Sequence, residues 1–160
     1  MLNIRVQNDN DLDFLTRLLE IEANAPLAPA ATTQEAYIFA DNPSGRYAGA
    51  VIYRRRNTDE SFAATEVLSQ VDLDTLPRRG EFIEVILCWI HPDYRRLGLG
   101  RELLTHLEKA AHHNGIHLVY LQTGGKNVAG KQFARKMKYK EIFRGRIGDE
   151  PLKIGYMKKV

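Results

Sequence analysis

The run from Glu84 to Gly115 constrains the fold more than any other part of this sequence. Six apolar residues in succession, several of them β-branched or aromatic, follow Glu84, as in a strand that is covered on both faces. A turn with two glycines comes next, and Leu103, Leu107 and Ala110 then recur at helical spacing before Gly115, where a helix would stop. The run therefore predicts a buried strand, a tight turn and an amphipathic helix.

The turn itself, Arg95-Arg96-Leu97-Gly98-Leu99-Gly100, has the features of a phosphate-binding loop. Glycines let the backbone turn sharply, so that several N–H groups can point at one anion, and the positive end of the following helix adds to the attraction. Arg95 and Arg96 bring positive charge to the same place. An isolated pattern of this kind also occurs in ordinary strand-to-helix turns, but the strand before it and the helix after it favour an anion site.

The chain resembles the GNAT N-acetyltransferase superfamily in the order and lengths of these elements and in the His91-Pro92 pair before the turn. The acetyl-CoA site of that family is a strand, a turn of the form [RQ]-x-x-G-x-[GA] and a helix. The match is sharp from about Glu81 to Tyr139 and only topological elsewhere. It implies acetyl-CoA as co-substrate, an amine as acceptor, and cofactor contacts from Ile90, Arg95, Arg96, Leu97, Gly98, Leu99, Gly100, Arg101 and Asn127.

Length and composition predict one soluble domain over residues 1–160. The chain has 160 residues, 44% hydrophobic and 27% charged, which suits a single core. No apolar run approaches the length of a membrane span, and the first residues lack the basic and apolar blocks of a signal peptide. We therefore expect a cytoplasmic protein without a membrane partner. Cys88 is the single cysteine, which agrees with a reducing compartment.

The charge is unevenly distributed along the chain. Residues 1–76 carry 6 basic and 12 acidic side chains, whereas residues 126–160 carry 11 and 3. A basic tail can attract nucleic acid, but it contains no recognisable nucleic-acid module, and a solvated basic face is the commoner meaning. We therefore expect no nucleic-acid partner. The acceptor class and the oligomeric state stay open, with a homodimer among the options.

The remaining segments predict a mixed, mostly antiparallel sheet with a central parallel strand pair and helices on both faces. The segment Ile116–Thr123 should lie parallel to Glu84–Ile90, because a strand, a helix and a strand in succession make a right-handed crossover. The other expected elements are a strand at Leu2–Gln7, a helix ending near Asn24, a Pro/Ala linker at 25–31, a short helix between Thr33 and Asn42, strands at Tyr47–Tyr53 and Ala64–Leu73, a helix at Asn127–Lys138, and strands at Tyr139–Arg146 and Leu152–Lys158.

Acetyl transfer to an amine needs a base, and Glu84 is the candidate. A lysine-type amine has a pKa of about 10.4, so its proton must be removed near neutral pH. Period-two alternation would place Glu84 on one face of its strand with Ile86, Cys88 and Ile90. The strand also resembles that of the histone acetyltransferases, where the leading Glu is the general base. The alternatives are a structural carboxylate paired with an arginine, or Glu81 as the base.

The resemblance also implies an oxyanion donor, the backbone N–H of Cys88, and a backbone pairing of Ile90 with the pantetheine arm. The Cys88 thiol itself is expected to be a small buried group and not a nucleophile, because no Cys-His-Asp arrangement is visible. No metal is expected, since one cysteine and five histidines show no metal-ligand spacing.

Asn127 opens a segment that resembles the family's fourth block, N-x-x-A-x-x-x-Y-x-x-x-G-[FY], only in part. Ala134 stands where the family has its acidic tyrosine, and Lys138 replaces the glycine before Tyr139. Tyr120, Tyr139 and Tyr156 are possible substitutes, although each also suits a core position. The missing tyrosine leaves a second hypothesis open, an acetyl-CoA-binding regulator without catalysis.

Overall fold

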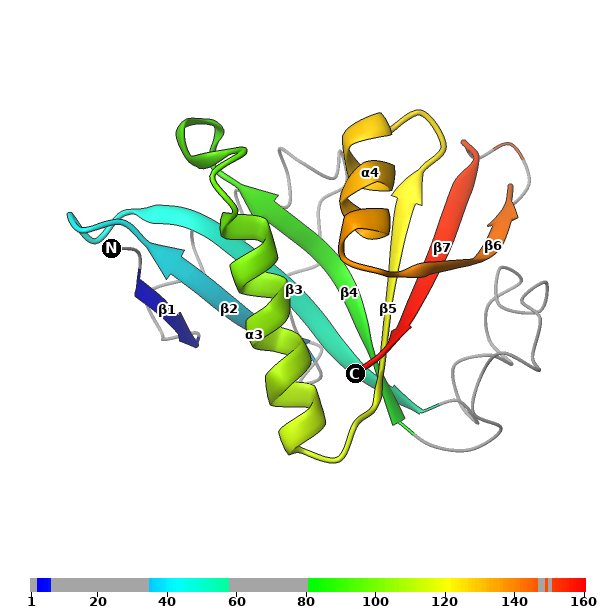
Figure 1. The fold of residues 1–160 in the computed structure, drawn as a ribbon, viewed down its shortest axis with the longest axis horizontal. Helices are drawn as coiled ribbons and strands as arrows, with labels where there is room; N and C mark the ends of the chain where they lie inside the picture. The colour runs from blue at the N-terminus through cyan, green and yellow to red at the C-terminus, as the bar shows by residue number, and fades with distance from the viewer. Residues whose placement is uncertain (1–2, 7–34, 58–80, 147–148, 150) are drawn as a thin grey trace.

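A computed structural model describes residues 3–6, 35–57, 81–146, 149 and 151–160 (Figure 1). In chain order the elements are β1 (Asn3–Val6), β2 (Glu35–Asp41), β3 (Tyr47–Asn57), β4 (Glu81–Ile90), the 3-10 helix η4 (Pro92–Tyr94), α3 (Leu99–His113), β5 (Leu118–Gly124), α4 (Val128–Lys136), β6 (Lys140–Gly145) and β7 (Lys153–Lys159). None of the helices in these residues is long and apolar enough to cross a membrane.

The strands form one mixed sheet in the order β1-β2-β3-β4-β5-β7-β6. Strands β4 and β5 pair in parallel, and each of the other neighbouring pairs is antiparallel. Helix α3 makes the crossover between the two parallel strands. The predicted mixed α/β fold, with a central parallel pair in a mostly antiparallel sheet, is confirmed.

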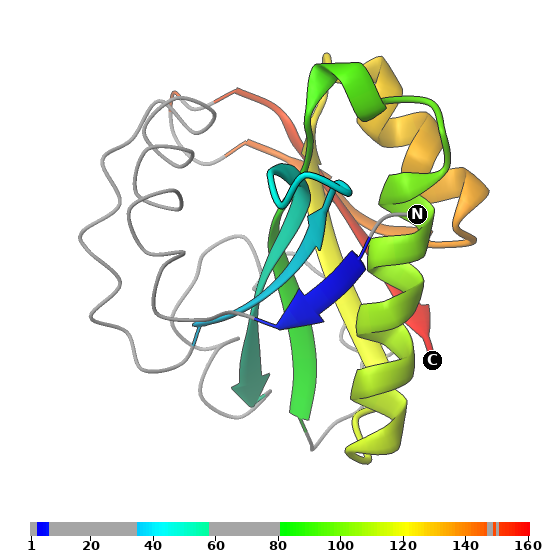
Figure 2. The same cartoon turned by 90° about the vertical axis from the view of Figure 1, so that its left-hand side faces the viewer.

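Both described helices cover the same face of the sheet, as the side view shows (Figure 2). We call this the helix face. Leu103, Leu104 and Leu107 of α3 are at most 1% exposed and pack there with the buried side chains of β3, β4, β5 and β7. The opposite face carries a smaller apolar cluster that includes Phe82 and Tyr120. The helix predicted to end near Asn24, which would cover this second face, lies outside the described residues.

The predicted helix between Thr33 and Asn42 is wrong, because Glu35–Asp41 is strand β2. Its five successive apolar residues, 36–40, carry little phase information of their own, and pairing with β1 on one side and β3 on the other decides the conformation. The linker at 25–31 and the strand expected at Ala64–Leu73 lie outside the described residues. The other predicted strands and helices that fall on described residues are present, with ends shifted by a few residues.

Candidate active site

Strands β4 and β5 make a fork. They pair over Ile83–Val85 and Val119–Leu121, and beyond these residues β4 continues beside β3 alone within the described chain. Figure 1 shows the two strands separating toward their carboxyl ends. Among the described strands, none pairs with the edge of β4 that faces away from β3 from residue 86 onward.

A β-bulge at Ile86 changes which side chains of β4 face the helices. Leu87 pairs with Ile52 and Val85 with Tyr53, so Ile86 is an extra residue without a partner on β3. A bulge reverses the alternation beyond it, and Cys88 and Ile90 consequently pack on the helix face together with Val85. Glu84 alternates with Val85 and faces the other side. The expectation that Glu84, Cys88 and Ile90 share a face is therefore wrong.

The backbone of β4 presents its amides to the fork. The His91 N–H donates to the Ala48 carbonyl at 2.9 Å, which fixes the residues whose amides point at β3. Because amides alternate along an antiparallel pair, the N–H groups of Cys88 and Ile90 point the opposite way, toward the gap left by β5. The Cys88 side chain has a separate environment, in which burial raises the pKa of the thiol to about 12. The thiol therefore stays protonated, as expected of a packing group.

The turn after β4 leaves the start of α3 uncapped. Gly98 has φ 86° and makes no side-chain cap, and the first helical bond runs from the Glu102 N–H to the Gly98 carbonyl at 3.0 Å. The N–H groups of Leu99, Gly100 and Arg101 therefore have no carbonyl acceptor within the helix. An anion bound to them would also be stabilised by the positive end of the helix dipole.

The arginines of the turn differ in their contacts. Arg95 Nε donates to the Ile90 carbonyl at 3.0 Å and ties the turn to the end of β4. Arg96 has a positive φ of 62°, an unusual backbone for a non-glycine residue. The side chains that border the uncapped helix start and are exposed are those of Arg95, Arg96, Leu97, Arg101 and Glu102.

Glu84 forms an ion pair on the face away from the described helices. Its Oε2 contacts Arg56 Nε, and both side chains are about a quarter exposed. Tyr120, its neighbour on β5, is 2% exposed and its hydroxyl accepts a hydrogen bond from Gln122 Nε2 at 2.7 Å. Burial raises the pKa of Tyr120 to about 12 against the opposing effect of the Gln122 bond, and the nearby Glu84 charge adds to the rise. Sequence reasoning missed Arg56, because nothing in the sequence gives the β3–β4 register.

Glu81, the alternative base, is less well placed. It lies two residues before the parallel ladder begins, and its Oε2 accepts from Arg55 at 2.5 Å in an exposed ion pair. Geometry favours Glu84, which sits within the ladder where the fork opens.

Helix α4 supplies a cap and a buried alanine. The Asn127 side chain accepts from the Gly130 N–H at 2.9 Å and caps the helix. The loop between β5 and α4 lies at the same end of the sheet as the turn after β4 (Figure 1). Ala134, at the family's tyrosine position, is fully buried. Any acid for the leaving group must therefore come from another group.

Tyr139 belongs to a buried polar network that the sequence did not predict. Its hydroxyl donates to Glu108 at 2.9 Å, and Lys158 Nζ donates to both Glu108 oxygens at 2.9 and 3.0 Å. Burial, followed by the Glu108 charge, raises the pKa of Tyr139 far above its ordinary value. This hydroxyl holds its proton tightly and is a poor acid.

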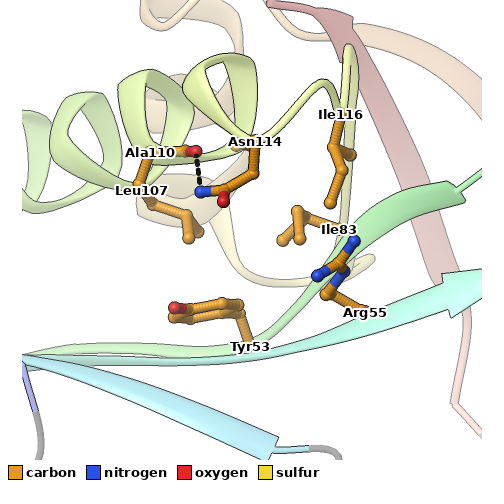
Figure 3. Close-up of a pocket in the computed structure, with 8 residues that line it drawn as sticks. Tyr53, Arg55, Ile83, Leu107, Ala110, Asn114 and Ile116 are labelled. Carbon is orange, nitrogen blue, oxygen red and sulfur yellow. Dashed lines mark hydrogen bonds between the residues drawn. The ribbon is translucent and has the colours of Figure 1, made fainter.

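A cavity of about 190 Å³ lies at the other end of α3 (Figure 3). Its apolar walls include Ile83, Leu107 and Ile116, which are only 1–3% exposed, and Asn114 at its rim donates to the Ala110 carbonyl at 2.7 Å. No predicted site residue lines it, so we do not assign it to the active site. The described residues hold no group of three or more His, Cys, Asp or Glu side chains placed for a metal ion.

Comparison with known proteins assigns the family. The model of the acetyltransferase (GNAT) family matches residues 7–139, and the chain belongs to this family. No curated protein matches the sequence.

Solved structures share the fold at low sequence identity. The structure of Arabidopsis thaliana NAA60 with a bisubstrate analogue has a TM-score of 0.78 and 16% identity, covering 100% of this chain and 99% of that chain. The same protein with acetyl-CoA gives a TM-score of 0.77 and 13% identity, with full coverage of both chains. The ribosomal-protein-S18-alanine N-acetyltransferase from Escherichia coli gives 0.70 and 16%, covering 100% and 94%.

Proposed function

We propose that this protein transfers an acetyl group from acetyl-CoA directly to a primary amine. The observation that carries the proposal is the fork: the Cys88 and Ile90 amides face a gap beside β4, and the uncapped start of α3 lies at the end of the same strand. Family membership supports acetyl-CoA as the co-substrate.

Different residues around the fork suit different parts of acetyl-CoA. Bound acetyl-CoA supplies an acetyl group activated as a thioester. The N–H groups of Leu99, Gly100 and Arg101, with the charges of Arg95 and Arg96, suit the oxygens of its diphosphate. The Ile90 N–H suits a polar group of the pantetheine arm, and the Cys88 N–H is the donor for the carbonyl oxygen as negative charge develops there. Asn127, occupied as a cap, contributes through the helix start that it orders.

Glu84 takes the proton of the amine, directly or through one water, and leaves the nitrogen lone pair free to attack. Ala134 supplies no acid and the Tyr139 hydroxyl is committed to Glu108. We therefore propose water, and neither of these two residues, as the proton donor to the leaving thiolate, which is a stable enough anion to depart without a dedicated acid.

The acceptor is a primary amine of a protein or of a small molecule. One structural neighbour is named for the alanine of a ribosomal protein, so protein α-amines are the first class to test. An α-amine has a pKa of about 7.7–8.0 and makes a smaller demand on the base than a lysine side chain does.

Turnover with a panel of amines tests the proposal. The panel contains peptides with free α-amines, lysine peptides with blocked N-termini, polyamines, amino acids and aminoglycosides, and release of free thiol is measured for each. We expect acceptor-dependent thiol release from at least one class. Tight acetyl-CoA binding with no turnover on any amine would overturn the proposal in favour of a regulator.

A further inference from the structure

Glu84 lies between two arginines of β3 on the face away from α3 and α4. Arg54 is its directly opposite residue in the β3–β4 pair, and Arg56 is opposite Phe82. The ion pair is nevertheless made with Arg56, which reaches Glu84 diagonally along the same face. Diagonal neighbours are separated by about 7–8 Å at their Cα atoms, within reach of long side chains.

Burial distinguishes this ion pair from the neighbouring one. The side chains of Arg56 and Glu84 are 23% and 24% exposed, whereas those of Arg55 and Glu81, one step away on the helix face, are 55% and 47% exposed. Exposed pairs contribute little. A pair that is three-quarters buried is screened less by water, so each partner constrains the orientation of the other more strongly.

The other described groups around Glu84 carry no second anion. Arg54 and Arg56 approach from β3, Tyr120 lies beside it on β5 as a neutral phenol, and Phe82 precedes it on its own face of β4. The contact through Arg56 engages Oε2, which leaves Oε1 as the oxygen for a substrate or a water.

We propose that Arg56 is a positioning residue for acetyl transfer: it holds the Glu84 carboxylate in one orientation beside the fork. This inference rests on the proposed function. The proton moves from the amine to Glu84, the amine nitrogen keeps the electron pair that forms the new C–N bond, and the C–S bond breaks with its electrons on sulfur. Arg56 takes no part in the proton transfer and acts only through its contact with Glu84.

The test compares kcat and the KM for acetyl-CoA in Arg56→Gln, with one acceptor amine and one pH used for all variants. A base that is held less firmly in its productive orientation lowers kcat without weakening cofactor binding. We expect kcat of Arg56→Gln to fall by about tenfold or more with the KM for acetyl-CoA unchanged, while Arg56→Lys, which keeps a cation beside Glu84, recovers part of the loss. Arg55→Gln, a matched loss of an exposed pair on the other face, should leave both constants unchanged.

A purely structural role gives a different result. An Arg56→Gln protein that folds and keeps the wild-type kcat, in a variant set where Glu84→Gln loses activity, would overturn the positioning role alone. Full activity in Glu84→Gln would instead overturn the base assignment of the proposed function. If Arg56→Gln does not fold, Arg56→Lys decides: we expect its kcat to fall several-fold with the KM for acetyl-CoA unchanged, and an unreduced kcat would contradict the proposal.

Discussion

The two ends of the β4–α3 unit differ in whether their backbone N–H and C=O groups are paired. At the closed end, β4 pairs with both β3 and β5, and the last carbonyls of α3 accept bonds from the N–H groups of Asn114, Gly115 and Ile116. At the open end, residues 86–90 of β4 have lost β5 and the first amides of α3 have no intrahelical acceptor. Both ends use a positive-φ glycine, Gly115 and Gly98.

This difference separates packing from binding. Backbone groups that stay unpaired in a folded protein need water or a ligand, and they are concentrated where the cofactor should lie. Substitutions at the closed end should therefore change the free energy of unfolding, and substitutions at the open end should change binding and turnover.

The largest expected effect is at the fork itself. Glu84→Gln keeps the size of the side chain and removes its basicity, so kcat should fall by about 10²–10⁴-fold while acetyl-CoA binding persists. Glu81→Gln is the matched control on the same strand and should stay near the wild type. Steady-state kinetics with calorimetry of acetyl-CoA checks both, and an unchanged kcat and pH profile in Glu84→Gln would move the base role to Glu81 or to bulk water.

The next effect is on stability at the closed end. Glu108→Ala leaves Lys158 and Tyr139 without their buried partner, which should lower the free energy of unfolding by about 3 kcal/mol. Lys109→Ala, one residue along and exposed, should change it by at most about 0.5 kcal/mol. Denaturant unfolding measures both. Weakened acetyl-CoA binding in Glu108→Ala without a loss of stability would contradict the idea that the closed end serves stability and the open end serves binding.

Much of this architecture could be predicted from the residues. The strand–turn–helix run and the crossover to β5 followed from a continuous apolar run, paired glycines and helical spacing, each of which is a local signal. The bulge at Ile86 could not be predicted. Six apolar residues in succession fit either phase of a strand, so the sequence did not indicate where alternation reverses. The Arg56–Glu84 pair depends on the β3–β4 register, which is a tertiary property.

Ala134→Tyr tests the missing acid. The alanine is fully buried against the sheet, so a phenol there overpacks the core and should cost about 1–3 kcal/mol of stability, with little change in kcat. Ala129→Tyr, on an exposed position of the same helix, controls for the substitution alone. A large gain in kcat with unchanged folding and cofactor affinity would contradict the view that water serves as the acid.

A smaller effect, on the free energy of unfolding, is expected at alkaline pH. Burial raises the pKa of Tyr139 above its ordinary value of about 10, so the unfolded chain loses this proton first as the pH rises. The stabilisation is complete below pH of about 10 and is lost progressively above it. Tyr139→Phe should flatten part of this decline in thermal melts, the remainder coming from groups such as Cys88, Tyr53 and Tyr120, whose pKa values burial also raises. Equal alkaline slopes in the two proteins would show that Tyr139 does not contribute.

Calorimetric titration of acetyl-CoA into Gly98→Glu and Gly115→Glu tests the central claim most directly. Both glycines have a positive φ and open space around the position of a Cβ, so the two substitutions carry a similar backbone cost of about 1–2 kcal/mol and the same added charge. The two substitutions differ in the end of α3 at which the charge is added. We predict that Gly98→Glu weakens the affinity by about tenfold or more, because the new carboxylate meets the diphosphate, and that Gly115→Glu leaves it unchanged. Equal affinity in a folded Gly98→Glu protein would contradict the assignment of the cofactor site.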